Sequence, residues 1–182
     1  MKHFIFKKDL CENLSTKSIV FGAGCFWGVE KKFWQLSGVT MTSVGYSGGN
    51  FENPSYEEVC SGLTNHVEVV KVTYKNNSDI KKLLKTFWEC HDPTQGMRQG
   101  NDIGTQYRSV IFCNSENQLE LAKESQAIYQ KTLKEAGYNS ITTEISMLQN
   151  YYLAEEYHQQ YLAKNPSGYC GIGGTNCTFP SD

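Results

Sequence analysis

The sequence predicts a one-domain α+β or α/β sandwich in which helices pack on a single sheet of four to six strands. Segments with strand-like and helix-like spacing of apolar residues alternate along the chain. No internal repeat or low-complexity linker divides the 182 residues, of which 39% are hydrophobic. A chain of this length can bury a core without disulfide bonds. One domain over residues 1–182 is therefore expected.

The first half of the chain contains three predicted strands and two predicted helices. A short apolar run at Ser18 to Phe21 predicts a buried strand, and the apolar residues from Phe26 to Leu36 recur at helical spacing. A second strand is expected from Val39 to Tyr46. Asn53-Pro54 opens a short helix, and His66 to Tyr74 forms the third strand.

The strongest local pattern is an amphipathic helix that Asp79 caps and that ends before Pro93. One face of this helix carries large apolar side chains, namely Ile80, Leu83, Leu84, Phe87 and Trp88. The loop that follows, 92–106, is long and polar, with three glycines. Loops of this length in a compact domain are usually functional or mobile, so we expect it near the site.

The second half predicts two strands, two helices and a tail. Tyr107 to Cys113 is a strand, and Ser115 with Gln118 forms a capping box for a helix that stops near Gly137. A strand near 141–145 and a helix over 151–162 follow. From Pro166 the chain has too few apolar residues to hold regular structure, so 165–182 is expected to be a flexible tail near the site.

Bulk charge excludes several classes of partner. The formal net charge is -2 and the sequence pI is about 6.1, which offers no basic field for nucleic acid or an anionic membrane. The apolar run in the lead-in, about 1–16, is broken by lysines too early for a signal peptide, and no later segment could span a bilayer. A cytoplasmic protein without nucleic-acid or membrane partners is expected.

Seven cysteines are an odd number, too few for a disulfide scaffold, so redox chemistry or metal binding has to be considered. Cys170 and Cys177 share a glycine-rich segment, with six residues between them. Four others are expected to be structural: Cys11, Cys60, Cys90 and Cys113. The four histidines show no zinc-ligand spacing, and no nucleotide-binding glycine pattern occurs, so neither metal nor cofactor is expected.

The seventh cysteine lies in Gly24-Cys25-Phe26-Trp27-Gly28, between glycines, beside two aromatic residues and where a helix begins. The unpaired amides at a helix start favour an anion, so the pKa of Cys25 is expected to fall below the free-thiol value of about 8.5. A reactive thiol in a hydrophobic pocket is one interpretation. A buried structural cysteine is the other, and the pentapeptide alone does not separate them.

Three further polar residues could serve a site. The two-residue period of its strand puts Glu68 on the face of Val70 and Val72, where burial would raise the pKa of a general acid. Alternatively, Glu68 lies at the exposed strand end, paired with a lysine. Asp102 could orient a substrate or only satisfy turn backbone, and Tyr56 could donate to a substrate oxygen or only pack its ring.

Two tail thiols favour sulfur-directed redox chemistry, since each sulfenate or disulfide must be resolved by another thiol. A cysteine hydrolase or transferase would need a base, usually histidine, and would not use the tail. A metal-binding module built from Cys170, Cys177 and a histidine is the third alternative.

Long motifs in one order resemble the A-type peptide methionine sulfoxide reductases. They run from about Ser18 to Gly174: Gly24-Cys25-Phe26-Trp27-Gly28, Gly45-Tyr46-Ser47-Gly48-Gly49, Asn53-Pro54-Ser55-Tyr56, His66-Val67-Glu68, His91-Asp92-Pro93, Gly100-Asn101-Asp102, Gly104-Thr105-Gln106-Tyr107-Arg108 and Gly168-Tyr169-Cys170-Gly171. The resemblance also implies a two-layer sandwich around a mixed sheet.

The resemblance implies a role for each candidate residue. Cys25 would attack the sulfur of methionine-S-sulfoxide, free or in a peptide, and Glu68 would protonate the sulfoxide oxygen. The remaining residues would bind the substrate: Phe26 and Trp27 the ε-methyl group, Tyr56 and Tyr107 the same oxygen, and Asp102 the substrate as a whole.

The resemblance also implies that the reaction repairs oxidised proteins and that further cysteines return Cys25 to its reduced state. After methionine leaves, Cys25 would be a sulfenic acid that Cys170 attacks to give a Cys25-Cys170 disulfide. Cys177 could then exchange onto Cys170, leaving a disulfide for thioredoxin to reduce. Family members vary in the number and spacing of recycling cysteines, and the lead-in through Thr16 matches no family motif.

Overall fold

The computed structural model describes residues 1–10 and 17–180 and confirms the expected sandwich around one mixed sheet. The sheet contains six strands: β1 (Ser18–Ala23), β2 (Val39–Ser47), β3 (Val67–Tyr74), β6 (Ser109–Cys113), β7 (Glu144–Met147) and β8 (Tyr152–Leu153). Their order across the sheet is β7-β6-β1-β3-β2-β8. Only β6 and β7 pair in parallel, and the other neighbours are antiparallel.

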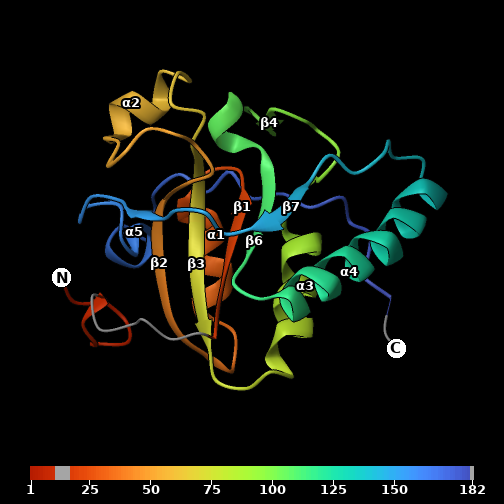
Figure 1. Ribbon diagram of the computed structural model, residues 1–182, viewed down its shortest axis with the longest axis horizontal. Coiled ribbons are helices and arrows are strands. Elements are labelled where there is room, and N and C mark those ends of the chain that lie inside the picture. Colours follow the sequence, from red (N-terminus) through yellow and green to blue (C-terminus); the bar gives the residue numbers. More distant parts are fainter. Residues whose placement is uncertain (11–16, 181–182) are drawn as a thin grey trace.

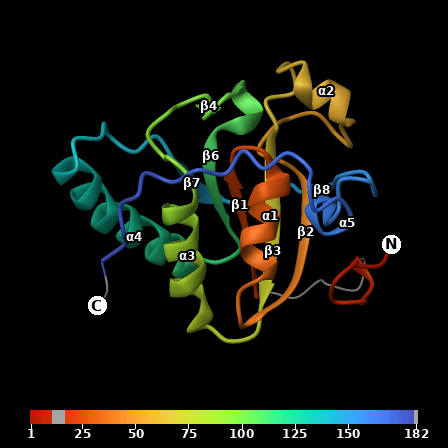
Figure 2. The same ribbon diagram turned by 180° about the vertical axis from the view of Figure 1, so that it is seen from behind.

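Three helices cover one face of this sheet, and two short helices lie at its margins (Figure 1). The covering helices are α1 (Phe26–Trp34), α3 (Asp79–Cys90) and α4 (Glu116–Glu135), and the short ones are α2 (Tyr56–Cys60) and α5 (Tyr161–Lys164). The view from behind shows α1 in front of the strands, α3 beside α1, and α4 beyond α3 (Figure 2). The layer of helices on one mixed sheet confirms the predicted fold class.

The main core lies between the sheet and these helices. Phe21 of β1 stacks on Phe33 of α1 and on Phe87 of α3, with ring centroids 4.8 and 5.1 Å apart. A second, smaller cluster on the opposite sheet face comprises Val20, Val67, Val69, Val110 and Phe112, with Leu148 and Tyr151 packed against them. Alternate residues of β1 and β3 therefore contribute side chains to two separate cores, because successive side chains of a strand point to opposite faces of the sheet.

The predicted helix over 151–162 is wrong. The chain forms β8, then turns, and only 161–164 is helical. The reason is tertiary: the Gln159 side chain accepts from the Val44 N–H at 2.9 Å and donates to the Val44 carbonyl at 2.8 Å. Gln160 has φ +48°, which no right-handed helix can include. Helical spacing of apolar residues was outweighed by these contacts with β2.

Smaller differences concern boundaries. The strand expected from Tyr107 begins at Ser109, after a 3-10 turn η2 (Thr105–Tyr107), and the strand expected near 141–145 is β7 at 144–147. The polar loop 92–106 contains a two-stranded hairpin of β4 (Arg98–Gln99) and β5 (Asp102–Ile103).

The described parts of the two terminal segments, 1–10 and 165–180, contain no α-helix and no strand of the sheet, but they are packed against the rest of the protein. In the lead-in, His3 is fully buried, and its Nδ1 accepts the N–H groups of Ile5 and Phe6 at 3.1 Å. Cys11 lies outside the described residues. After Lys164 the described chain has no helix or strand, as predicted, and it runs across α1 and α3 to end beside α4 (Figure 2).

We expect Phe87→Ala to lower the free energy of unfolding by about 3–5 kcal/mol, because it empties the centre of the main core. Leu63→Ala is the matched control. Leu63 is 90% exposed, so its truncation should change stability by no more than about 0.5 kcal/mol. Urea denaturation measures both values, and a loss below about 1 kcal/mol for Phe87→Ala would contradict the packing described.

Candidate active site

Cys25 occupies the turn between β1 and α1 and caps the N-terminus of α1, as the sequence predicts. The turn depends on Gly24, whose φ is +90° and where a Cβ would lie 2.8 Å from the side chain of Gln99. Only glycine combines that backbone with so close a neighbour. The chain therefore turns sharply at the end of β1, and this turn places Cys25 at the start of α1.

Glu68 reaches the same point from the second residue of β3. Its carboxyl accepts the Phe26 N–H at 3.0 Å, and the residue is only 2% exposed. The alternative of an exposed, lysine-paired Glu68 is wrong. Burial is the main cause that raises the pKa of Glu68 to about 8, with the charge of Asp102 adding to it and the Phe26 hydrogen bond opposing it. Glu68 is thus a neutral acid at pH 7.

The expectation that the pKa of Cys25 falls below 8.5 is wrong. Burial raises the pKa of the Cys25 thiol, and the neighbouring Glu68 raises it further. The backbone amide of Trp27 lowers the pKa of the thiol, which is the predicted helix-start effect, but burial outweighs it, and the Cys25 side chain makes no capping hydrogen bond. Without substrate, the site therefore holds a thiol beside a protonated carboxyl group.

Two tyrosines and an aspartate complete the polar side of the site. Tyr56 begins α2, Tyr107 ends η2 and Asp102 lies in β5. Burial raises the pKa of both tyrosines, and the charge of Glu68 acts on each of them, while Asp102 acts on Cys25 and on Tyr107. Side chains from three separate elements therefore lie within electrostatic reach of Glu68 or Cys25. This arrangement is what a shared site would need.

Cys60 belongs to this group as well. It is exposed rather than packed in the core, whereas Cys90 and Cys113 are buried. Burial raises the pKa of its thiol, the nearby Tyr56 hydroxyl lowers it, and the charge of Glu68 raises it further. Cys60 is therefore not a core cysteine like Cys90 and Cys113, since its side chain is exposed beside Tyr56.

His158 and Tyr161 hold the aromatic side of the site and were missed as site residues from the sequence. The Trp27 indole N–H donates to His158 Nδ1 at 3.0 Å, and the Trp27 ring stacks on Tyr161 with centroids 3.8 Å apart. Phe26 also packs against the His158 ring, with 5.0 Å between the ring centroids. The sequence held one signal for this pair: His158 and Tyr161 are three positions apart and would share one face of the helix predicted over 151–162.

The tail brings Cys170 to the start of α1. A Cβ at Gly28 would lie 3.1 Å from the Cys170 sulfur, so glycine at this helix position lets the tail approach. The Tyr169 hydroxyl donates to Asp102 at 3.2 Å and ties the tail to β5. Cys170 is exposed, and an electrostatic interaction with it is among the smaller causes that raise the pKa of Cys25.

Cys177 lies elsewhere. It is half-buried and packed against the main core, and its carbonyl accepts the hydroxyl of Tyr129 in α4 at 3.0 Å. In the docked tail the structure thus brings Cys170, and not Cys177, to Cys25.

Within residues 1–10 and 17–180, no cluster of three or more His, Cys, Asp or Glu side chains could hold a metal ion. Over the same ranges, no helix is both long and apolar enough to cross a membrane.

Comparison with known proteins points to one family. Residues 17–178 match the model of the family described as peptide methionine sulfoxide reductase. The chain is 61% identical over 183 residues to the peptide methionine sulfoxide reductase MsrA of Pseudomonas putida (strain W619), covering 98% of this chain and 82% of the relative.

Solved structures agree with the sequence matches. The methionine sulfoxide reductase A of Corynebacterium diphtheriae superposes with a TM-score of 0.88 at 44% identity, covering 100% of this chain and 90% of that one. Mxr1 from Saccharomyces cerevisiae, solved in complex with Trx2, gives a TM-score of 0.52 at 27% identity over 80% of this chain and 84% of that one.

We expect Glu68→Gln to let Cys25 ionise at lower pH, because the substitution removes a neighbouring negative charge that disfavours the thiolate. The pH profile of Cys25 alkylation by iodoacetamide, followed by mass spectrometry, should move down by about one unit. Asp102→Asn is the matched control, with a smaller shift in the same direction, since the charge of Asp102 acts less strongly on Cys25. An unmoved profile in Glu68→Gln would contradict the coupling.

Proposed function

This chain belongs to the peptide methionine sulfoxide reductase family, and on that basis we propose that Cys25 is the nucleophile that reduces methionine-S-sulfoxide, free or in oxidised proteins. The observation that carries the proposal is the hydrogen bond from the Phe26 N–H to the Glu68 carboxyl, at 3.0 Å. It fixes a buried acid beside the cysteine at the helix start. A sulfoxide needs both groups, since its oxygen must be protonated as its sulfur is attacked.

In the first step, Glu68 gives its proton to the sulfoxide oxygen while the Cys25 sulfur attacks the sulfoxide sulfur, and the Cys25 proton passes to Glu68. The oxygen then transfers to Cys25, so that methionine leaves and Cys25 becomes a sulfenic acid. Methionine sulfoxide gains two electrons and Cys25 loses two. The pKa of Glu68, about 8, supports this role because the acid holds its proton at neutral pH.

The surrounding side chains would orient the substrate. Phe26 and Trp27 provide an apolar surface for the ε-methyl group, and the hydrogen bond from Trp27 to His158 fixes the indole plane. Tyr56 and Tyr107 would donate hydrogen bonds to the sulfoxide oxygen. Burial raises the pKa of both hydroxyls, which keeps them protonated as donors. Asp102 would bind the rest of the substrate.

Recycling would follow in two exchanges. The Cys170 sulfur attacks the Cys25 sulfenic acid, which forms the Cys25-Cys170 disulfide and releases water. Cys177 then attacks Cys170, frees Cys25 and leaves a Cys170-Cys177 disulfide. The contact of Cys170 with Gly28 supports the first exchange. Mxr1 has been solved in complex with Trx2, which supports thioredoxin as the final reductant here. The cytoplasm remains the predicted location.

The proposal predicts that Cys25→Ser forms no methionine from the S epimer of methionine sulfoxide with thioredoxin or a dithiol. Cys113→Ser is the matched control, because Cys113 is buried in β6, and it should retain turnover. The unmutated chain should leave the R epimer unchanged. Methionine formation by Cys25→Ser at the unmutated rate would overturn the proposal.

Replacing the recycling cysteines separates the two exchanges. With thioredoxin, Cys170→Ser should release about one methionine per chain and then stall as the Cys25 sulfenic acid, which a dimedone adduct detected by mass spectrometry would reveal. Cys177→Ser should still form the Cys25-Cys170 disulfide but turn over more slowly. Full thioredoxin-supported turnover by Cys177→Ser would remove the second exchange from the route.

A further inference from the structure

We propose that α4 holds Cys177 in a docked position through the hydroxyl group of Tyr129, and that the tail must leave α4 before Cys177 can exchange with Cys170. This inference rests on the recycling route proposed above. It assigns to Tyr129, which lies outside the site, a positioning role in the second exchange.

The hydroxyl of Tyr129 is the centre of the docking contacts. Tyr129 is fully buried, and its hydroxyl donates to the Cys177 carbonyl at 3.0 Å. The same oxygen lies 3.0 Å from the hydroxyl of Thr175. Because the single proton of Tyr129 goes to Cys177, the hydroxyl of Thr175 is the donor in the second contact. One tyrosine thus binds the tail at two positions, two residues apart.

Contacts on either side extend this attachment. The Tyr138 hydroxyl donates to the Thr175 carbonyl at 3.1 Å, and the Phe179 N–H donates to a carboxylate oxygen of Glu89 in α3 at 2.8 Å. At Gly174 a Cβ would overlap the carbonyl oxygen of Glu89, so the backbone lies directly on α3. The segment Gly174–Pro180 is therefore fastened to both α3 and α4.

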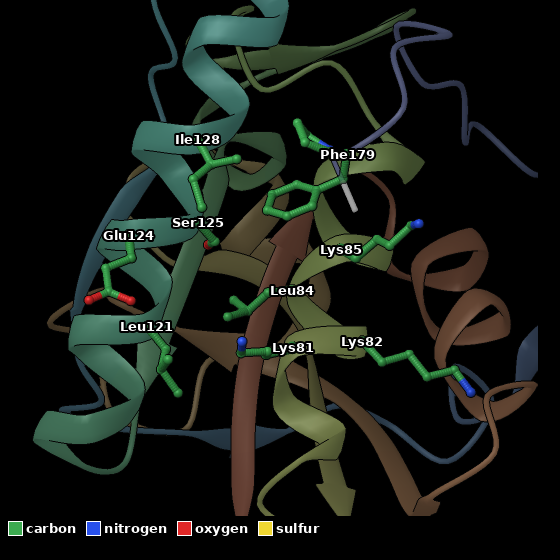
Figure 3. A pocket seen from close by; sticks show the side chains of 10 residues that line it. Lys81, Lys82, Leu84, Lys85, Leu121, Glu124, Ser125, Ile128 and Phe179 are labelled. Carbon is green, nitrogen blue, oxygen red and sulfur yellow. The ribbon is translucent and has the colours of Figure 1, made fainter. Parts of the chain in front are cut away.

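The ring of Phe179 adds an apolar anchor. It stacks on Tyr129 with centroids 5.9 Å apart and lies at one end of a groove of about 340 Å³ between α3 and α4 (Figure 3). The two helices line this groove with the apolar side chains of Leu84, Leu121 and Ile128, and the tail adds Phe179 and Pro180. Withdrawal of the tail would expose this ring, which favours the docked state.

Docking separates the two recycling thiols. The Cys170 sulfur lies against Gly28 on α1, whereas the Cys177 sulfur faces the carbonyl of Thr175, 3.8 Å away, beside α4. The tail between them extends over α3 (Figure 2). A disulfide requires the two Cα atoms to come within about 7 Å with their side chains facing each other. Because Cys170 is held at α1 and Cys177 at Tyr129 of α4, we infer that Cys177 leaves α4 before the exchange. The docked state thus delays the second exchange until the tail opens.

Alkylation of Cys177 by iodoacetamide measures the opening directly. Cys170→Ser chains, fully reduced, leave Cys177 as the only cysteine in the C-terminal tryptic peptide 165–182. In that background we expect Tyr129→Phe to speed alkylation of Cys177 about fivefold, since it removes the bonding hydroxyl and keeps the ring. Tyr74→Phe is the matched control. It also removes a buried hydroxyl, but that hydroxyl accepts a hydrogen bond from Gln118 and does not touch the tail, so the rate of Cys177 alkylation should not change.

Two results would overturn the docking: a Cys177 rate in the parent chain equal to that in urea-unfolded chain, or the same rate in Tyr129→Phe as in the parent. Should Tyr129→Phe fail to fold by circular dichroism, Tyr138→Phe tests the same segment through its bond to Thr175.

A single-turnover experiment with all cysteines present tests the exchange. After one equivalent of methionine-S-sulfoxide, Tyr129→Phe should form the Cys170-Cys177 disulfide faster and the first methionine at the unmutated rate. Equal disulfide rates would overturn the gating. Absence of this disulfide in the unmutated chain would overturn the proposed exchange, while the alkylation result would still decide whether the tail is docked.

Discussion

The hydrogen bond from the Phe26 N–H to Glu68 is the contact on which the site depends. It joins the first turn of α1 to the start of β3 and places a carboxyl group beside Cys25. The free-energy cost of burying this group is seen in its pKa, about 8 against 4.5 in the unfolded chain. Glu68 therefore stabilises the fold only while protonated. That contribution is complete below about pH 4.5 and is lost as pH rises through about 8.

The same burial explains why Cys25 is not a thiolate in the absence of substrate. An exposed, ionised cysteine would react with many electrophiles and oxidants, whereas a half-buried, protonated thiol beside a neutral acid reacts more slowly until a ligand engages both groups. In the proposed mechanism the sulfoxide is that ligand, since its oxygen takes the Glu68 proton and the resulting carboxylate can accept the proton of Cys25. Selectivity for sulfoxides and protection of the thiol then have one physical origin.

Sequence periodicity predicted the order of the main strands and helices, because their apolar faces are determined locally. It placed Cys25 at a helix start, and the family motifs identified Glu68 and the two tyrosines. Three features of the structure could not be predicted from the sequence pattern. The helix over 151–162 is broken by contacts of Gln159 with β2, the pKa of Cys25 is set by burial, and His158 meets Trp27 from 131 residues away. All three depend on contacts between distant segments, which local patterns do not encode.

The central claim is that Glu68 is a neutral acid beside Cys25 at neutral pH. Carbon-13 NMR of chains labelled at the glutamate carboxyl carbons tests it most directly, with Glu68→Gln used to assign the resonance. The carboxyl carbon of Glu68 should titrate with a midpoint near pH 8, well separated from those of the exposed glutamates. A midpoint near 4.5 would contradict it, because Glu68 would then be ionised at neutral pH and have no proton to give.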